Sequence, residues 1–175
     1  MTIIVTGAAG KTGQAVVSAL ARTGAVVRAL VRRPDQTGLL LRLGATEAQV
    51  CDLYHADELR AGFTHARAVY HICPNVSPDE VQIGANVIAA AQQAGVTRVV
   101  YHSVLHPQTQ TMPHHWNKLR VEEALFASGL DVTILQPTAY MQNLLANWGR
   151  ICQDGILRNP YPVETRLSLV DLADV

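Results

Sequence analysis

The sequence has few cysteines and no excess of charge of either sign. Three cysteines, Cys51, Cys73 and Cys152, stand far apart among 175 residues and never form a C-x-x-C pair. This scarcity argues against a disulfide framework and a zinc knuckle, and it predicts free thiols in a reducing compartment. Fourteen basic residues balance fourteen acidic ones. The chain therefore lacks the electrostatic signature of a protein that binds nucleic acid or an anionic membrane.

The sequence also shows no pattern typical of a leader sequence or of a membrane span. The chain enters a strand-like segment at once, without a basic region followed by a cleavable apolar one, and no uncharged run approaches the length of a membrane span. Apolar residues make up 49% and charged residues 16%. These values predict one globular domain over residues 1–175, located in the cytoplasm.

What the sequence does contain is a regular alternation of strand-like and helix-like segments. Such a rhythm predicts an α/β fold, a doubly wound parallel sheet of the Rossmann type with a central first strand. Ligands of such sheets bind beyond the carboxyl ends of the strands. The expected strands are residues 2–6, 26–31, 48–51, 68–73, 98–103 and 132–135, and the expected helices include residues 39–43, 57–63, 78–94 and 113–128.

A glycine-rich turn follows the first strand and opens a helix. Gly7 permits a tight turn, Gly10 lets the backbone approach a pyrophosphate, and Gly13 lets the helix pack closely on the strand. The turn also resembles the end of a P-loop, but Val5 stands where that motif needs its first glycine. Dinucleotide binding is therefore favoured, through Gly7, Ala9, Gly10, Lys11, Thr12 and Gly13.

The end of the second strand indicates which dinucleotide. Arg32 and Arg33 occupy the place where an acidic residue would bind the ribose of NAD, and guanidinium groups pair well with a 2′-phosphate. NADP is thus favoured over NAD, although two arginines could simply be solvated in this loop. Asp52 could accept a hydrogen bond from the adenine amino group, or it could be a turn residue. Further expected cofactor contacts at strand ends are Leu53, Cys73, Pro74, Ser103 and Pro137.

The helix at residues 113–128 carries the candidate chemistry. His114 and Lys118 are four residues apart and share one helix face, so Lys118 could bind ribose hydroxyls. The alternative is a surface ion pair between Lys118 and Glu122, also four apart. A metal site is not expected, because the histidine pairs lack a third ligand at suitable spacing. Ser103 has no G-x-S-x-G context that would make it a hydrolase nucleophile.

Taken in order, these motifs resemble the NmrA-like branch of the atypical short-chain dehydrogenases/reductases. The resemblance spans nearly the whole chain, and it implies a Rossmann domain that binds NAD(P). It also implies that Ser103, Lys118 and the loop after Pro137, including Tyr140, face the nicotinamide. The motifs that carry it are Thr6–Gly13, residues 31–34, 101–104, Lys118 with residues 121–123, residues 128–130 and residues 133–143.

Two departures from the family pattern shape the functional expectation. Active short-chain reductases usually have a tyrosine four residues before the lysine, where this chain has His114, which could serve as the acid instead. Family members also continue into a substrate-covering region that this sequence lacks, so we expect a truncated chain or fragment. An NAD(P)H-dependent oxidoreductase acting on a small carbonyl or quinone-like acceptor is favoured. The alternatives are a redox-sensing regulator with a protein partner, or a nucleotide-sugar epimerase; a homodimer is possible.

Overall fold

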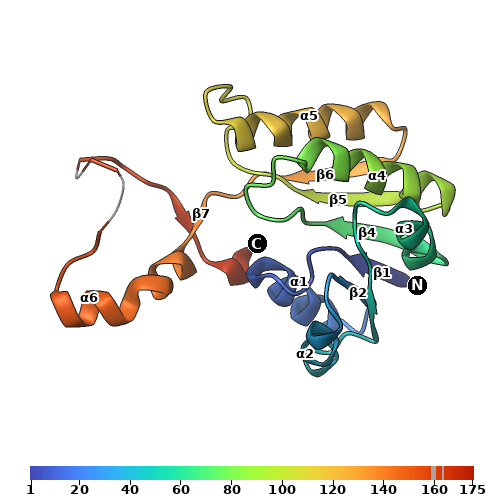
Figure 1. Ribbon diagram of the computed structural model, residues 1–175, viewed down its shortest axis with the longest axis horizontal. Helices are drawn as coiled ribbons and strands as arrows, with labels where there is room; N and C mark the ends of the chain where they lie inside the picture. The colour runs from blue at the N-terminus through green and yellow to red at the C-terminus, as the bar shows by residue number, and fades with distance from the viewer. Residues whose placement is uncertain (159–160, 163) are drawn as a thin grey trace. The chain divides into compact units, whose positions relative to one another are not determined.

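The computed structural model describes residues 1–158, 161–162 and 164–175, and it contains a six-stranded parallel sheet (Figure 1). The order is β3-β2-β1-β4-β5-β6, so β1 is central, as predicted. Strand order reverses between β1 and β4, and it is at the carboxyl ends of strands flanking such a switch point that ligands bind in open parallel sheets. The strands are β1 (Thr2–Val5), β2 (Val26–Val31), β3 (Glu47–Val50), β4 (Ala66–His71), β5 (Arg98–His102) and β6 (Asp131–Leu135).

Helices cover both faces of this sheet. Successive residues of a strand point to opposite faces, so apolar strands leave both faces of the sheet apolar and both must be covered. Ile4 packs in the cluster beneath three of the helices, whereas the next residue, Val5, packs in the cluster beneath the other two. The alternation predicted a doubly wound fold, and the structure confirms it. The first face carries α3 (Ala56–Phe63), α4 (Glu80–Gln93) and α5 (Pro113–Ala127); the second carries α1 (Lys11–Arg22) and α2 (Thr37–Arg42), which follows the short 3-10 helix η1 (Pro34–Gln36).

Strand β4 departs further from its predicted bounds than the other strands do, since it lies two residues earlier than residues 68–73. The reason for its early end is the side chain of Thr6, which directly follows the neighbouring strand β1. The N–H of Ile72 donates to Oγ1 of Thr6 at 3.0 Å, and the Thr6 hydroxyl lies 3.2 Å from the Ile72 carbonyl oxygen. The chain therefore leaves the sheet after His71, at the carboxyl edge of the sheet next to β1.

The structure divides the chain into two compact units, Met1–Gln136 and Pro137–Val175, and each is described by itself. The second unit has a small parallel pair of strands, and none of its described residues is buried. No helix in the described parts of the chain is both long and apolar enough to span a membrane. Its elements are β7 (Ala139–Tyr140), η2 (Met141–Asn147), α6 (Trp148–Asp154), β8 (Leu169–Val170) and η3 (Leu172–Asp174).

Candidate functional site

The turn between β1 and α1 runs so close to β4 that it tolerates no side chain at Gly7. This residue has φ +60°, and a Cβ atom there would lie 2.6 Å from the carbonyl oxygen of Ile72. Thr6 fixes the same junction through its bonds to Ile72 and through Oγ1, 2.8 Å from Nδ1 of His71. The glycine loop therefore lies at the switch point, where dinucleotides bind in such sheets.

Helix α1 begins directly after this loop and packs tightly against it. A Cβ atom on Gly13 would lie 2.3 Å from the carbonyl oxygen of Gly7, so any side chain would push the helix off the loop. Gly10 is the N-cap residue, no side chain caps the helix, and its first turn has no acidic residue. The first-turn N–H groups and the positive end of the helix dipole thus remain suited to an anion such as a pyrophosphate.

The two arginines after β2 have different surroundings. The guanidinium group of Arg33 forms a bidentate ion pair with the carboxylate of Asp35. Its Nε donates to Oδ1 at 3.1 Å and its Nη2 donates to Oδ2 at 3.2 Å. Hydrogen bonding to this carboxylate raises the pKa of Arg33. Arg32 is also exposed, and in the described part of the chain no residue forms a hydrogen bond or ion pair with its guanidinium group. Arg32 is therefore the arginine better placed to bind a phosphate.

Asp52 and Leu53 form a turn after β3. Oδ1 of Asp52 accepts a hydrogen bond from the Tyr54 N–H at 3.0 Å, and the Leu53 carbonyl accepts one from Nδ2 of Asn86 at 3.0 Å. The structure thus gives Asp52 the turn role that the sequence left open, and its contact with adenine stays a prediction. Beyond β4, Cys73 is buried and Pro74 is exposed. Burial raises the pKa of the Cys73 thiol, so this sulfur is held in its neutral form.

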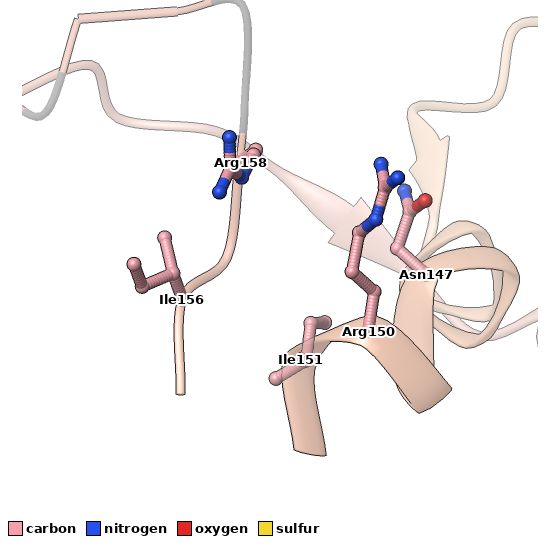
Figure 2. Close-up of a pocket in the computed structure, with 5 residues that line it drawn as sticks. All are labelled: Asn147, Arg150, Ile151, Ile156 and Arg158. Atoms are coloured by element: carbon pink, nitrogen blue, oxygen red, sulfur yellow. The ribbon is translucent and has the colours of Figure 1, made fainter. Parts of the chain in front are cut away.

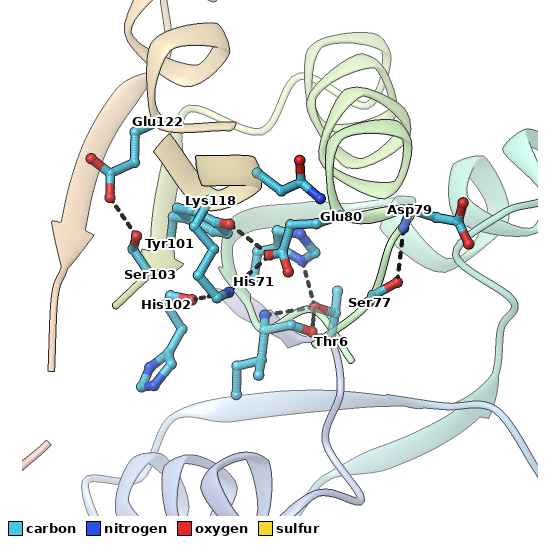
Figure 3. Close-up of polar contacts among 12 residues, drawn as sticks. Thr6, His71, Ser77, Asp79, Glu80, Tyr101, His102, Ser103, Lys118 and Glu122 are labelled. Carbon is cyan, nitrogen blue, oxygen red and sulfur yellow. Dashed lines mark hydrogen bonds and ion pairs between the residues drawn. The ribbon is translucent and has the colours of Figure 1, made fainter. Parts of the chain in front are cut away.

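Lys118 has a partner that the sequence did not indicate. Its Nζ atom lies 2.8 Å from Oε1 of Glu80 and 3.2 Å from the carbonyl oxygen of His102 (Figure 3). The alternative of a surface pair between Lys118 and Glu122 is wrong, because Lys118 lies against the sheet and its side chain is only 15% exposed. A buried carboxylate on the neighbouring helix takes that role instead.

The meeting of Glu80 and Lys118 follows from the close packing of α4 on α5. A Cβ atom on Gly84 would lie 2.7 Å from Cγ2 of Val121, so glycine is what permits this approach. Glu80 stands one turn before Gly84, and Lys118 almost one turn before Val121. The beginnings of both helices therefore meet above β5. Glu80 is in the first turn of α4, where the helix dipole stabilises a carboxylate.

Tyr101 of β5 completes this buried group. Its hydroxyl donates to Oε1 of Glu80 at 2.7 Å, and Nζ of Lys118 lies 5.3 Å from the centre of its ring. Burial and the Glu80 carboxylate raise the pKa of Tyr101, so the phenol keeps its proton. The chain thus brings a phenol and a lysine together, but the phenol comes from a strand and donates to a carboxylate.

Ser103 follows β5 and is bonded to a second buried carboxylate. Its hydroxyl donates to Oε1 of Glu122, and Nε2 of Gln136 lies 3.0 Å from both oxygens of the same carboxylate. Glu122 is only 4% exposed. Because the Ser103 proton is directed at Glu122, its oxygen retains acceptor capacity toward a ligand.

The histidines near the site differ in environment. His114 lies in the first turn of α5 against His115, with the ring centres 4.5 Å apart. Desolvation, followed by the nearby His115 and Lys118, lowers the pKa of His114. Burial lowers the pKa of His102 to about 4 and that of His71 to about 3. Among the described residues, no three histidines, cysteines or carboxylates gather into a metal-binding group.

The remaining expected contacts, Pro137 and Tyr140, belong to the second unit, so their role at a nicotinamide stays a prediction. That unit also contains a pocket (Figure 2), lined by Asn147, Arg150, Ile151, Ile156 and Arg158. Sequence reasoning assigned no site role to Glu80, and it named Thr6, Tyr101 and Glu122 in motifs without giving them the contacts that the structure shows. Glu80 carried one usable signal, an acidic residue next to a predicted helix start.

Comparison with known proteins agrees with this architecture. Quinone oxidoreductase 2 of Escherichia coli (strain K12) is 31% identical over 160 residues, which cover 88% of this chain and 54% of that protein. The NAD(P)H azoreductase of Xenophilus azovorans is 32% identical over 178 residues, covering 99% of this chain and 60% of that protein. The chain therefore spans little more than half the length of these relatives.

A solved structure shows the same fold. The NADPH-dependent quinone oxidoreductase of Escherichia coli, complexed with NADPH, superposes with a TM-score of 0.77 at 28% identity. The match covers 87% of this chain and 54% of that one. The family model of the NmrA-like family matches residues 1–175, the whole of the sequence. The chain belongs to the NmrA-like family.

Proposed function

We propose that the protein is an NADPH-dependent oxidoreductase that reduces a small quinone-like acceptor. The observation that carries this proposal is the glycine loop at the switch point, with the exposed Arg32 at the end of the adjoining strand β2. Relatives described as a quinone oxidoreductase and an azoreductase support the reaction class, and a relative complexed with NADPH supports the cofactor.

The residues present fit a phosphorylated dinucleotide. The uncapped start of α1 would bind the pyrophosphate, and a Cβ on Gly10 would itself meet only the carbonyl oxygen of Gly7, at 3.3 Å. Arg32 would bind the 2′-phosphate, with Arg33 secondary because Asp35 already pairs with it. NAD, which lacks this phosphate, would gain nothing from either arginine. Lys11, Thr12 and Ala9 would line the same loop.

The bound cofactor would supply a hydride to the acceptor, and the chain would supply orientation and a proton. Lys118, fixed by Glu80, would bind the ribose hydroxyls at the nicotinamide end. His114, one turn earlier on α5, would donate the proton that the reduced acceptor requires. Ser103 would accept a hydrogen bond, because its own proton is directed at Glu122.

An acceptor panel tests the reaction. Purified full-length protein is mixed with NADPH and a series of quinones, azo compounds and aldehydes, and NADPH oxidation is followed by absorbance. Turnover with quinones supports the proposal. Binding of NADPH without turnover on any acceptor would contradict it and favour a redox-sensing regulator, in which case a protein partner gained or lost with NADPH would be sought.

Arg32→Ala tests the cofactor assignment. Removing a hydrogen bond to a charged phosphate should weaken NADPH binding by about 1.5–3 kcal/mol and leave NADH binding nearly unchanged. Calorimetric titration of both dinucleotides measures this, and Arg33→Ala is the matched control with a smaller expected loss. Equal losses for the two cofactors would show that Arg32 does not recognise the 2′-phosphate.

The proposal also includes the kind of acceptor and the cellular compartment. We infer a small-molecule acceptor and a cytoplasmic location. The free thiols of Cys51, Cys73 and Cys152 are compatible with a reducing compartment.

A further inference from the structure

Glu80 is an unusual carboxylate for a residue outside the proposed reacting groups. It is only 1% exposed, and a single oxygen, Oε1, accepts from both Tyr101 and Lys118, at 2.7 and 2.8 Å (Figure 3). The second oxygen, Oε2, is buried and has no hydrogen-bond partner among the described residues. A buried ion pair with an unsatisfied oxygen contributes little to folding stability, because the cost of removing both charges from water offsets much of their attraction.

The same geometry does fix the direction of the Lys118 ammonium group. This group has three N–H donors, of which one is directed at Oε1 of Glu80 and one at the carbonyl oxygen of His102. With those two directions occupied, the direction of the third follows from tetrahedral geometry. The ammonium group of Lys118 also lies over the ring of Tyr101, which further restricts the orientation of this side chain.

We propose that Glu80 is a positioning residue for Lys118, and that it directs the remaining Lys118 N–H toward the ribose hydroxyls of the bound dinucleotide. This inference rests on the proposed function, since it concerns the same cofactor site. Glu80 itself acts through Lys118 and is not assigned a contact with the cofactor. Its role is to fix the place and direction of a donor before the cofactor arrives, which lowers the ordering cost of binding.

Replacing Glu80 has two effects on NADPH affinity, and they have opposite signs: one comes from its negative charge and the other from its orientation of Lys118. This difference makes the inference testable. NADPH is an anion, so removing a nearby negative charge should by itself tighten its binding. Loss of Lys118 orientation should weaken it. Glu80→Gln removes the charge and keeps the size of the side chain, and we expect the dissociation constant of NADPH to rise about tenfold, as for one hydrogen bond to a charged donor.

Two further single variants protect the test from a simple folding defect. Glu80→Asp keeps the charge but shortens the side chain, so the carboxylate should no longer reach Lys118 and NADPH binding should again weaken. Tyr101→Phe is the matched control, because it removes the other hydrogen bond to Oε1 and leaves the ion pair with Lys118. It should alter NADPH affinity much less than Glu80→Gln. Thermal unfolding without cofactor reports the structural cost of each variant.

A double-mutant cycle then asks whether Glu80 acts through Lys118. In a Lys118→Met background there is no ammonium group to orient, so Glu80→Gln should no longer weaken NADPH binding, and loss of the negative charge should leave the dissociation constant unchanged or lower it. A merely structural role would instead produce the same loss of affinity in both backgrounds. Fluorescence titration with NADPH measures all four proteins of the cycle.

The outcomes separate this inference from the proposed function. Weaker NADPH binding in Glu80→Gln, abolished in the Lys118→Met background, supports the positioning role. Unchanged or tighter binding in Glu80→Gln, or additive losses, overturns it while NADPH binding by the wild-type protein still stands. Failure of the wild-type protein to bind NADPH overturns the proposed function and this inference with it.

Discussion

His114 occupies the place one helical turn before Lys118, and its environment favours an acid that releases its proton readily. Its pKa is lowered mainly by desolvation, with smaller contributions from His115 and Lys118. A lowered pKa means that the protonated form declines below the pH at which an ordinary histidine, with a pKa near 6.5, would lose its proton. If His114 donates the proton, kcat must be greatest at acidic pH.

His114→Phe tests that role at the level of one residue. We expect kcat to fall by about 100-fold or more, since a positioned general acid contributes at least that, while NADPH affinity stays close to wild type. In the wild-type protein kcat should decline as pH rises through the lowered pKa. His115→Phe is the matched control. Steady-state kinetics across pH measures both, and a pH profile retained in His114→Phe would exclude this acid.

His71 predicts a pH dependence of stability rather than of activity. Complete burial lowers its pKa from 6.5 to about 3 in the folded protein, whereas the unfolded chain keeps the ordinary value. The unfolded state then binds more protons, so this contribution is present above pH 6.5 and is lost as pH falls toward 3, by at most about 1.4 kcal/mol per pH unit. Thermal unfolding should show a shallower acid dependence in His71→Asn; an identical dependence would contradict the assignment.

At the scale of elements, the pairing of α4 with α5 decides whether the site forms. Gly84→Ala would place a Cβ atom 2.7 Å from Cγ2 of Val121, and such overpacking costs about 1–3 kcal/mol of folding free energy. It should also separate Glu80 from Lys118 and weaken NADPH binding. Adding Val121→Ala removes the clashing methyl groups. Denaturant unfolding and NADPH titration should therefore show partial recovery in the double variant, and further loss instead would disprove the packing argument.

At the scale of the whole molecule, the buried core belongs to one unit. Every residue classed as buried in the described chain lies before Gln136, and none of the described residues of Pro137–Val175 is buried. A chain ending at Gln136 should therefore remain folded and unfold cooperatively, as followed by circular dichroism. It should keep Arg32-dependent NADPH binding, measured by titration. Aggregation or loss of helical signal would show that the second unit is needed for folding.

Much of the architecture was predictable because its signals are local. Alternating apolar runs and glycine or proline punctuation gave β2 at residues 26–31 and placed α5 within one residue of Pro113–Ala127. The glycine loop was predictable for the same reason, since it joins a strand to a helix within a few residues. β4 ends two residues before its predicted end because a long-range contact, from Thr6 to Ile72, stops it.

The sequence by itself determined the doubly wound order of elements, the glycine loop and Arg32 at a strand end, because each depends on residues close together in the chain. Only the tertiary structure decided the partners of Lys118 and Ser103. Glu80 lies 38 residues from Lys118, and Glu122 lies 19 residues from Ser103. Spacing along one helix offered Glu122 as an alternative partner for Lys118, but the close approach that Gly84 permits between two helices gave that place to Glu80. Contacts between distant segments follow from packing, which no local pattern encodes.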